Sequence, residues 1–348
     1  MQRRLLCLTI LIIGILLIGS CKSSAGLIKE DLFAMDTYIT FTAYNKGQAK
    51  EAIEAAKKRV QEIEDLMSAT RADSELSKIN ENAGQRPVKV SDDTFYVIKK
   101  GIEYGQLTDG AFDISSLPIS RLWGIGSENP RLPASEEIAT SLKLVDYRSI
   151  VLDEQEKTVF LEKEGMMLDL GGIAKGYAGD EAMKVLKDYK LEHAMINLGG
   201  DIITLGGKAD ASPWRIGIQN PRPEEDNKGQ DYIGIFEIVT GSIVTSGDYQ
   251  RYIKDIYEKQ GIRYHHIFDP ETGYPADNGL ISVTIKGPTA VDSDALSTSV
   301  FIMGVEEGLK LINSLENVEA MIVTKDKKLY FSQGFEEQVK SIHPDYNN

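Results

Sequence analysis

The order in which strand-like and helix-like patterns follow one another is the feature that most restricts the fold of this chain. Residues 36–44 alternate between apolar and polar side chains, which is typical of a half-buried strand. Residues 47–68 place apolar side chains at helical spacing along one face, which is typical of an amphipathic helix. Later strands and helices mix without a regular strand–helix–strand alternation. We therefore expect an α+β fold with mixed or antiparallel sheets packed by helices, rather than a doubly wound sheet. The other expected elements are helices at 92–107, 177–189, 292–303 and 305–315, strands at 194–198, 214–219, 232–239 and 280–286, and hairpins at 149–163 and 318–332.

A glycine-rich run, DLGGIAKGYAGD at 169–180, leads directly into one of these helices. Gly171 and Gly172 permit a tight turn that brings backbone groups close to a ligand. The helix that follows directs free N–H groups and a positive dipole end at the same point, which favours a phosphate. A plain strand-to-helix turn is the alternative for an isolated Gly-Gly pair. The ligand-binding interpretation is favoured by four other motifs, which are NLGGD at 197–201, TSGDYQRY at 245–252, HHIFDPETG at 265–273 and DSDALST at 292–298.

The N-terminus reads as a targeting segment. Arg3 and Arg4 precede an apolar stretch at 5–18 that is short for a spanning helix. Small residues precede Cys21, an arrangement that resembles a bacterial lipobox; an ordinary secretory signal is the alternative. We expect lipid on Cys21 to hold the protein on a membrane of the bacterial cell envelope, facing the periplasm or the exterior. The expected segments are a lipoprotein signal peptide at 1–20, a tether at 21–32 and one domain at 33–340.

Charge and cysteine content exclude several classes of function. The formal net charge is −14 at pH 7, whereas a nucleic-acid-binding protein needs a basic face. We therefore expect no nucleic-acid partner. The two cysteines are Cys7 and Cys21, so the mature domain has no thiol for a disulfide, a zinc–thiolate site or a nucleophile. In such an acidic chain, a metal ion or backbone amides are expected to hold any phosphate-bearing ligand.

The motif DSDALST has the spacing of a hard-metal site. Asp294 and Thr298 are four residues apart, so a helix places their oxygen atoms on one face. Oxygen ligands suit Mg²⁺, which also keeps water and substrate phosphates in its shell. Ser297 is a neighbouring hydroxyl. Helix capping by Asp292 or Ser293 is the alternative explanation of the motif.

Two further motifs contain residues that could contact a flat ring or line a pocket. In HHIFDPETG, His266 and Phe268 point to the same side of an extended segment, which would place a base beside an apolar ring. A structural histidine beside a β-turn is the alternative. In GAFDIS, Phe112 is a core candidate, although the backbone of residues 111–113 could equally line a pocket. The sequence has no GxGxxG, GxxxxGKS or GxSxG motif, so Rossmann, P-loop and hydrolase-elbow sites are not supported.

Together these motifs resemble those of the thiamine-biosynthesis-lipoprotein (ApbE) family, whose members are FAD:protein FMN transferases. The resemblance extends from Phe33 to about Phe331. In the family's order it includes AMDTYIT, LMSATRADSEL, GAFDIS, LWGIG, DLGGIAKGYAGD, NLGGDI, TSGDYQRY, HHIFDPETG and DSDALSTSVFIMG. Each motif alone is weak, but the ordered set is highly specific.

The resemblance implies a T-fold-related α+β enzyme that binds FAD and Mg²⁺. Such an enzyme moves FMN to a threonine or serine hydroxyl of an acceptor flavoprotein and releases AMP. The resemblance assigns Mg²⁺ to Asp294, Thr298 and the carbonyl group of Ala174, with Ser297 as an additional ligand. It places His266 and Asp294 nearest the proton transfer. The residues implied to contact FAD are Met35, Thr70, Ala111, Phe112, Asp113, Gly171, Tyr177 and Phe268.

Two positions depart from the family pattern. Thr70 stands where many members carry tyrosine, and Asp36 stands where glycine is usual. A smaller residue at position 70 would leave room for water or a second metal ion beside the flavin. Hydrolysis of FAD to FMN and AMP is therefore an alternative activity of the same site. A lipid-anchored flavin-binding protein without catalysis is the alternative from another class.

Overall fold

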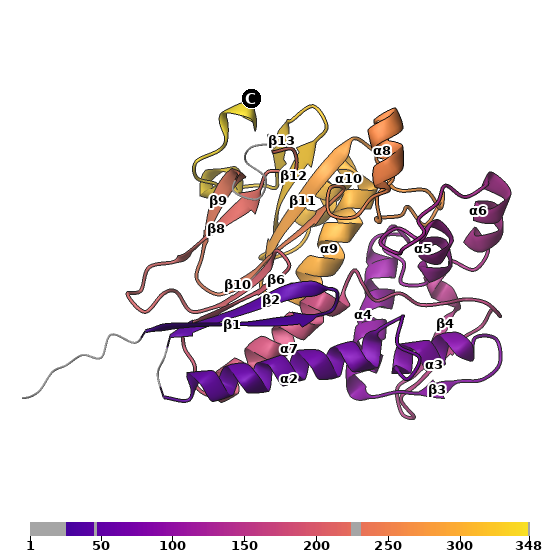
Figure 1. Cartoon of the computed structure of the whole chain (residues 1–348), viewed down its shortest axis with the longest axis horizontal. Coiled ribbons are helices and arrows are strands. Elements are labelled where there is room, and N and C mark those ends of the chain that lie inside the picture. The colour runs from indigo at the N-terminus through magenta and orange to yellow at the C-terminus, as the bar shows by residue number, and fades with distance from the viewer. Residues whose placement is uncertain (1–25, 45–46, 224–230, 347–348) are drawn as a thin grey trace, which may run out of the picture.

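The computed structural model describes residues 26–44, 47–223 and 231–346, and an eight-stranded sheet runs through its centre (Figure 1). All neighbouring strands of this sheet are antiparallel, and β1 and β13 form its two edges. In order across the sheet, the strands are β1 (Leu27–Ala34), β2 (Thr37–Tyr44), β6 (Ala194–Leu198), β7 (Asp201–Leu205), β10 (Gly241–Gly247), β11 (Leu280–Gly287), β12 (Glu319–Thr324) and β13 (Leu329–Phe331).

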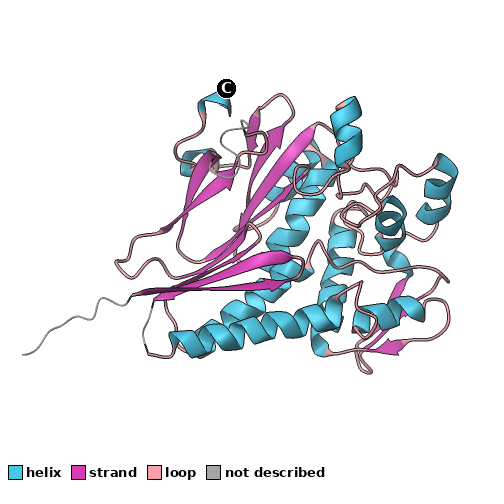
Figure 2. Cartoon of the chain, in the orientation of Figure 1, coloured by secondary structure: helices cyan, strands magenta, loops and turns pink. Residues whose placement is uncertain are grey.

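Long helices cover one face of the sheet (Figures 1 and 2). The apolar stripe of α2, including Ile53, Val60 and Ile63, is fully buried, as its helical spacing predicts. Helices α7 and α9 cross each other beneath the sheet, so the segments that begin these two helices come together. The helices of this layer are α2 (Ala49–Met67), α4 (Asp92–Leu107), α7 (Ala174–Asp188), α9 (Ala290–Met303) and α10 (Val305–Asn313).

A separate apolar cluster covers the opposite face of the sheet. It is built by the hairpin of β8 (Trp214–Gln219) and β9 (Tyr232–Ile238) together with C-terminal residues. The rings of Phe236 and Phe335 stack in this cluster with centroids 4.7 Å apart. Strand β11 is therefore buried on both faces of the sheet, which explains why it has hardly any polar alternation.

A third region packs beside the helices, to the right in Figure 1. Its small apolar cluster is centred on Trp123, which is fully buried and packs near Phe268. This region contains α3 (Glu75–Glu81), α5 (Leu117–Trp123), α6 (Ser135–Leu142) and the sheet of β3 (Val88–Lys89), β5 (Thr158–Leu161) and β4 (Ile150–Asp153). Helix α8 (Lys254–Gln260), at the top of Figure 1, packs Ile256 against the Trp123 cluster. No helix within the described ranges is both long and apolar enough to span a bilayer.

The predicted fold class is confirmed, and most of the predicted elements are present within a few residues of their expected ends. The helix expected at 177–189 begins earlier, at Ala174, directly after the glycine-rich turn. Several elements were not predicted, namely β1, β3, β7, β10, α3, α5, α6 and α8. Most of them are short, and β7 and β10 lack a clear alternation because both faces of the sheet are covered.

One boundary was wrong. Residues 27–32 were assigned to a tether, but they belong to β1, which pairs along its whole length with β2. The charged run at 29–31 concealed this strand because β1 is an edge strand, and its side chains alternate between exposed and half-buried positions. The predicted signal peptide at 1–20 and the lipidated Cys21 lie outside the described residues.

Candidate active site

The glycine-rich turn lies directly against α9. A Cβ atom on Gly172 would lie 3.2 Å from the ring of Phe112 and 3.5 Å from Oγ1 of Thr298. The absence of a side chain at position 172 therefore lets the turn approach both residues closely. Ala174 begins α7 at this point and is buried. The structure thus brings together the turn and the helix that the sequence analysis assigned to one metal site.

Asp294 joins α9 to the first turn of α7. Its side chain is almost fully buried, and its Oδ2 accepts the backbone N–H of Gly176 at 2.9 Å. The two helices approach so closely that a Cβ atom on Gly176 would lie 2.2 Å from the carbonyl oxygen of Ala290. Only glycine allows this approach, because any side chain would overlap the backbone of α9.

Lys175 lies between two buried carboxylates. Its ammonium is 2.5 Å from Oδ2 of Asp201 and 3.3 Å from Oδ1 of Asp294. Burial raises the pKa of Asp294 to about 6, and Lys175 opposes that rise. Burial acts to lower the pKa of Lys175, but the two carboxylates outweigh it and raise this pKa above its ordinary value. The site therefore places one cation between two buried carboxylates.

Asp201 was quoted within NLGGD but was not assigned a role. It is the first residue of β7, after a turn in which Gly199 and Gly200 both have positive φ. A turn in the left-handed region is what the two glycines supply. The position of Asp201 could have identified it, because this residue directly follows the glycine pair Gly199–Gly200, the second such pair among the motifs.

The hydroxyls of α9 differ in their surroundings. Ser297 is fully buried, donates to the backbone oxygen of Asp294 at 2.9 Å and lies 2.8 Å from Oγ of Ser246. Thr298 is partly exposed, and its Oγ1 lies 3.4 Å from the same Ser246 oxygen. Thr298 therefore faces the glycine-rich turn with a hydroxyl that has weaker internal partners than that of Ser297. Ser246 belongs to TSGDYQRY, one of the motifs that favoured a ligand-binding interpretation of the sequence.

The donor set fits a hard cation. Within the described ranges, no group of three or more His, Cys, Asp or Glu side chains could hold a metal ion. A metal at Asp294 would depend on hydroxyl and carbonyl oxygens for its other ligands. Thr298 and the first turn of α7 offer such oxygens next to the buried carboxylate, and oxygen donors are the ligands that Mg²⁺ prefers.

His266 is held by Arg251 on the opposite strand segment. Its backbone N–H donates to the carbonyl oxygen of Arg251 at 3.2 Å, and its Nδ1 lies 3.2 Å from the same oxygen. Burial lowers the pKa of His266 to about 4, and the positive charge of Lys175 adds to this effect. The imidazole is therefore neutral at pH 7 and able to accept a proton.

The sequence and the fold of this chain both match known proteins of one family. A model of the ApbE family matches residues 35–322. The chain belongs to the ApbE family. A FAD:protein FMN transferase of Klebsiella pneumoniae (strain 342) is 38% identical over 273 residues, which cover 78% of this chain and 82% of the relative. One from Treponema pallidum (strain Nichols) is 32% identical over 343 residues, covering 93% of this chain and 92% of the relative.

Solved structures of the ApbE family have the same fold. The crystal structure of the ApbE protein from Thermotoga maritima matches with a TM-score of 0.81 and 33% identity, over 91% of this chain and all of that chain. The flavin transferase ApbE from Vibrio cholerae matches with a TM-score of 0.79 and 28% identity, over 90% and 99% of the two chains. The family and fold predicted from the motifs are therefore confirmed.

The hairpin that carries the first ApbE motif has a strained turn, which a side chain of α2 holds by a hydrogen bond. Met35 and Asp36 both have positive φ, at 53° and 56°, in the two-residue turn between β1 and β2. The N–H of Met35 donates to Oε1 of Glu64 at 2.7 Å, and the carbonyl oxygen of Asp36 accepts from Arg251 at 3.4 Å. The left-handed φ at position 36 explains why glycine suits it, and aspartate tolerates this region better than most residues.

Three of the predicted FAD contacts have side chains that are occupied within the protein. The carboxylate of Asp113 accepts from Ser115 and from the backbone N–H of Tyr147, and the backbone N–H groups of residues 111 and 112 donate to Thr108. Phe268 is buried with its centroid 6.0 Å from that of Trp123. The hydroxyl of Tyr177 donates to Asp93.

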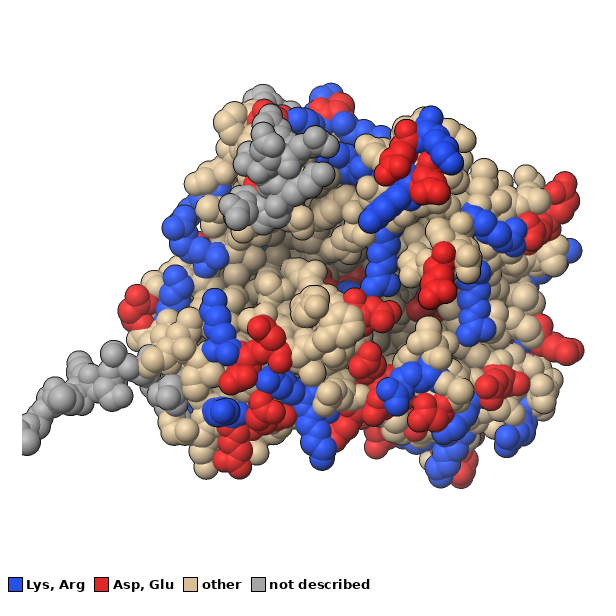
Figure 3. Space-filling model, in the orientation of Figure 1, with Lys and Arg blue, Asp and Glu red and all other residues tan. Residues whose placement is uncertain are grey.

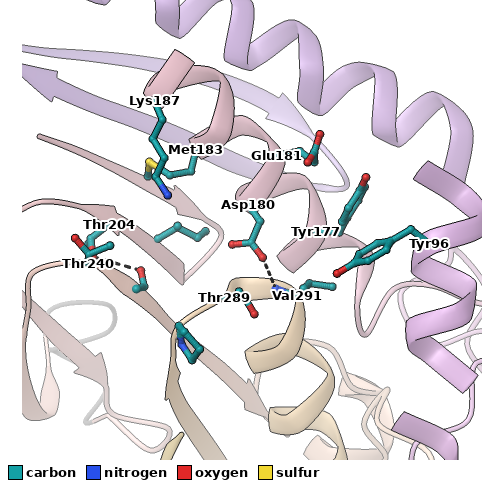
Figure 4. A pocket seen from close by; sticks show the side chains of 13 residues that line it. Tyr96, Tyr177, Asp180, Glu181, Met183, Lys187, Thr204, Thr240, Thr289 and Val291 are labelled. Atoms are coloured by element: carbon teal, nitrogen blue, oxygen red, sulfur yellow. Dashed lines mark hydrogen bonds between the residues drawn. The ribbon is translucent and has the colours of Figure 1, made fainter. Parts of the chain in front are cut away.

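The ring of Tyr177 lines a cavity of about 360 Å³ whose lining does not include Asp294 or Thr298 (Figure 4). This cavity lies at the N-terminal end of α9, where Tyr96 and Asp180 also face it. The side chain of Tyr177 thus faces this cavity from a different side of α7 than Lys175.

Thr70 lies on an exposed loop after α2. Its Oγ1 is 3.0 Å from Oγ of Ser68, and Arg121 donates to the neighbouring carbonyl oxygen of Ala69 at 3.2 Å.

Burial raises the pKa of Asp169, and the charges of Arg121 and Arg251 oppose this rise. Gly171 donates its N–H to that same carboxylate at 2.8 Å.

Arg121 and Arg251 thus connect three segments, namely the loop of Thr70, the glycine-rich turn and the β1–β2 hairpin. These segments surround one space. Figure 3 shows this face of the molecule hollowed near its middle, with acidic and basic side chains around the hollow. In Figure 1 the same region is where α9 and the β1–β2 turn come together.

Proposed function

We propose that this chain is a FAD:protein FMN transferase that requires Mg²⁺. The observation that carries the proposal is the meeting of Asp294, Thr298 and the glycine-rich turn in a chain of the ApbE family. The relatives at 38% and 32% identity are named FAD:protein FMN transferases, and their matches span most of this chain. The proposed substrates are FAD and an acceptor flavoprotein with a threonine or serine hydroxyl.

The proposed metal site uses the oxygens of Asp294 and Thr298 and the carbonyl of Ala174. Ser297 is the weaker member of the proposed set because its hydroxyl already donates to the backbone of α9. When bound, Mg²⁺ would neutralise the pyrophosphate of FAD and the charge that develops on the leaving AMP. The ammonium of Lys175 offsets part of the negative charge of Asp294 and Asp201, and the N-terminal end of α7 supplies a positive dipole end to the same place.

In the proposed reaction, the acceptor hydroxyl oxygen forms a bond to the phosphorus on the FMN side of FAD. The bond from that phosphorus to the AMP oxygen breaks, and AMP leaves. The hydroxyl proton passes to His266 or Asp294, which are the candidate bases. At pH 7 the imidazole of His266 is neutral, since its pKa is about 4, and Asp294 is largely ionised, since its pKa is about 6. The remaining residues position the two substrates.

FAD hydrolysis is a second candidate activity, and Thr70 is the observation that favours it. Its short side chain is exposed on the loop that Arg121 holds. A water molecule in place of the acceptor hydroxyl would give free FMN and AMP from the same site. A flavin-binding lipoprotein without catalysis is the remaining alternative, and it would leave FAD unchanged.

We also propose a lipid anchor at Cys21 that keeps the domain on a membrane of the bacterial envelope, facing the periplasm or exterior. Only residues 22–26 separate this cysteine from β1, so the domain would lie close to the membrane surface. Replacement of Cys21 by serine should release the protein from the membrane fraction. Retention of the Cys21→Ser variant on membranes would contradict a lipid anchor.

One experiment separates the transferase, the hydrolase and the non-catalytic flavin-binding protein. The purified full chain in detergent is incubated with FAD and Mg²⁺, with and without an acceptor, while AMP, free FMN and in-gel flavin fluorescence are followed. The acceptor is first identified as the band that becomes fluorescent in an envelope extract of the source cell. Flavin fixed on the purified acceptor supports the transferase, and AMP with only free FMN supports the hydrolase. No AMP under either condition contradicts both.

A further inference from the structure

Asp180 of α7 caps the start of α9, a helix that begins 110 residues later in the chain. Its Oδ1 accepts the backbone N–H of Ala290 and its Oδ2 accepts that of Val291, each at 2.9 Å. Figure 4 shows the Asp180 side chain reaching from α7 to the first turn of α9 at the edge of the cavity described above. These two donors are among the N–H groups that a helix leaves without internal partners at its N-terminus.

Helix α9 has no cap of its own. The N-cap residue is Thr289, and its side chain makes no capping hydrogen bond to the helix. Its hydroxyl donates instead to the carboxylate of Asp292. Asp292 in turn accepts from Lys100 and Tyr104 of α4. The N-cap hydrogen bonds that a Ser, Thr or Asp at the start of a helix usually makes are therefore made here by Asp180 on another helix.

The two helices hold each other by the same kind of bond in both directions. Asp180 of α7 accepts amides from the first turn of α9, and Asp294 of α9 accepts the Gly176 amide from the first turn of α7. Between the two bonds the backbones are in contact at Gly176 and Ala290. A shift of α9 along its axis would thus break both carboxylate–amide contacts together.

We propose that Asp180 is a positioning residue, which fixes α9 against α7 and thereby sets the place of Asp294 at the metal-binding end of the site. The proposal rests on the proposed function for its metal-binding consequence, while the positioning itself concerns only residues of this chain. It is independent of direct contact between Asp180 and a substrate. A carboxylate is needed because its two oxygens can each accept one amide.

The experiment compares Asp180→Ala and Asp180→Asn with Val300→Ala. Val300 is fully buried in α9 and faces α10, so its truncation destabilises the helix without touching the contacts of Asp180. For each full-length protein, Mg²⁺ affinity is measured by calorimetry and the exchange rate of the Gly176 amide by hydrogen–deuterium exchange. The kcat and KM for FAD in AMP release are measured in parallel, and melting temperatures show whether the variants are equally destabilised.

We expect Asp180→Ala to weaken Mg²⁺ binding by about 10-fold or more, as residues that orient a metal ligand typically do. We expect faster exchange of the Gly176 amide and a lower kcat, with little change in KM for FAD. Asp180→Asn keeps one acceptor oxygen and should recover part of the affinity. Val300→Ala should lower the melting temperature without changing either Mg²⁺ affinity or Gly176 exchange.

Equal Mg²⁺ affinity and equal Gly176 protection in Asp180→Ala and Val300→Ala would overturn the proposal. So would an Asp180→Asn variant that behaves no better than Asp180→Ala in both measurements. A wild-type protein that releases no AMP would instead contradict the proposed function. In that case Gly176 exchange in the Asp180→Ala variant still decides whether Asp180 positions Asp294.

Discussion

The ammonium of Lys175 lies 3.3 Å from a carboxylate oxygen of Asp294. Lys175 directly follows Ala174, so the two proposed metal ligands Ala174 and Asp294 are connected through this ion pair. The same ammonium also reaches Asp201 at 2.5 Å. Two carboxylates with almost no solvent exposure would repel each other without this cation. Lys175 therefore allows the protein to keep Asp201 and Asp294 buried side by side.

Replacement of Lys175 by methionine should destabilise the protein. The change leaves Asp201 and Asp294 buried without their cation, and we expect a loss of about 3 kcal/mol in the free energy of unfolding. This is the lower end of the range for breaking a buried ion pair, because the Lys175 side chain is 31% exposed. Urea unfolding at pH 7 measures the loss. Lys187→Met is the control, since Lys187 is exposed on the same helix; equal stability of the two variants would contradict the role given to Lys175.

Replacement of Asp294 by alanine should abolish Mg²⁺ binding and AMP release while the fold persists. We expect a fall in kcat of about 100-fold or more, because the proposed metal supplies several kcal/mol of charge stabilisation. Calorimetric titration with Mg²⁺ and an assay of AMP release check the two effects. Asp292→Asn serves as the control on the same helix, because Asp292 binds Lys100 and Tyr104 of α4. Unchanged AMP release in the Asp294 variant would remove Asp294 from the proposed site.

Replacement of Thr70 by tyrosine should shift the product from free FMN toward flavin bound to the acceptor. Thr70 lies on an exposed loop, so a tyrosine can be accommodated there and would displace water from the flavin side of the proposed site. The ratio of in-gel flavin fluorescence to free FMN measures the partition at a fixed acceptor concentration. Thr70→Ser keeps the small hydroxyl and is the matched control. An equal partition in the tyrosine and serine variants would mean that position 70 does not control the competing water.

His266 should make stability depend on pH in a defined window. Burial lowers its pKa to about 4, so the folded protein binds fewer protons at this group than the unfolded chain does. Its contribution is fully present above pH 6.5 and is lost as the pH falls toward 4. Between pH 7 and pH 4.5, we expect the free energy of unfolding to fall by about 2 kcal/mol more in the wild type than in His266→Gln. Urea unfolding at pH 7 and pH 4.5 provides the comparison, and the same pH dependence in both proteins would contradict a lowered pKa of His266.

Replacement of Gly176 by alanine should be strongly destabilising, because the new Cβ atom would lie 2.2 Å from the carbonyl oxygen of Ala290. We expect a loss of about 3 kcal/mol in unfolding free energy, together with a lower Mg²⁺ affinity, since α9 must move away from α7. Lys184→Ala on the exposed side of α7 is the control. A Gly176→Ala variant as stable as this control would show that the two helices do not need their close approach.

Local patterns predicted much of the fold. The helical spacing of Ile53, Val60 and Ile63 predicted a buried stripe of α2, and the structure confirms it. The spacing of Asp294 and Thr298 correctly predicted a shared helix. Edge strand β1 was missed, because a strand with one free edge and charged residues at 29–31 carries little apolar signal.

The sequence by itself determined the α+β class, the family and the residues of the glycine-rich turn and α9, because turns and helix faces depend on residues only a few positions apart. Tertiary structure decided which of these residues meet. The pairing of Lys175 with Asp201 and Asp294, and the capping of α9 by Asp180, join residues 26 to 119 positions apart. Such contacts depend on the crossing of α7 and α9 and on the order of strands in the sheet. No local spacing encodes that crossing, because it results from how Gly176 allows two backbones to pack.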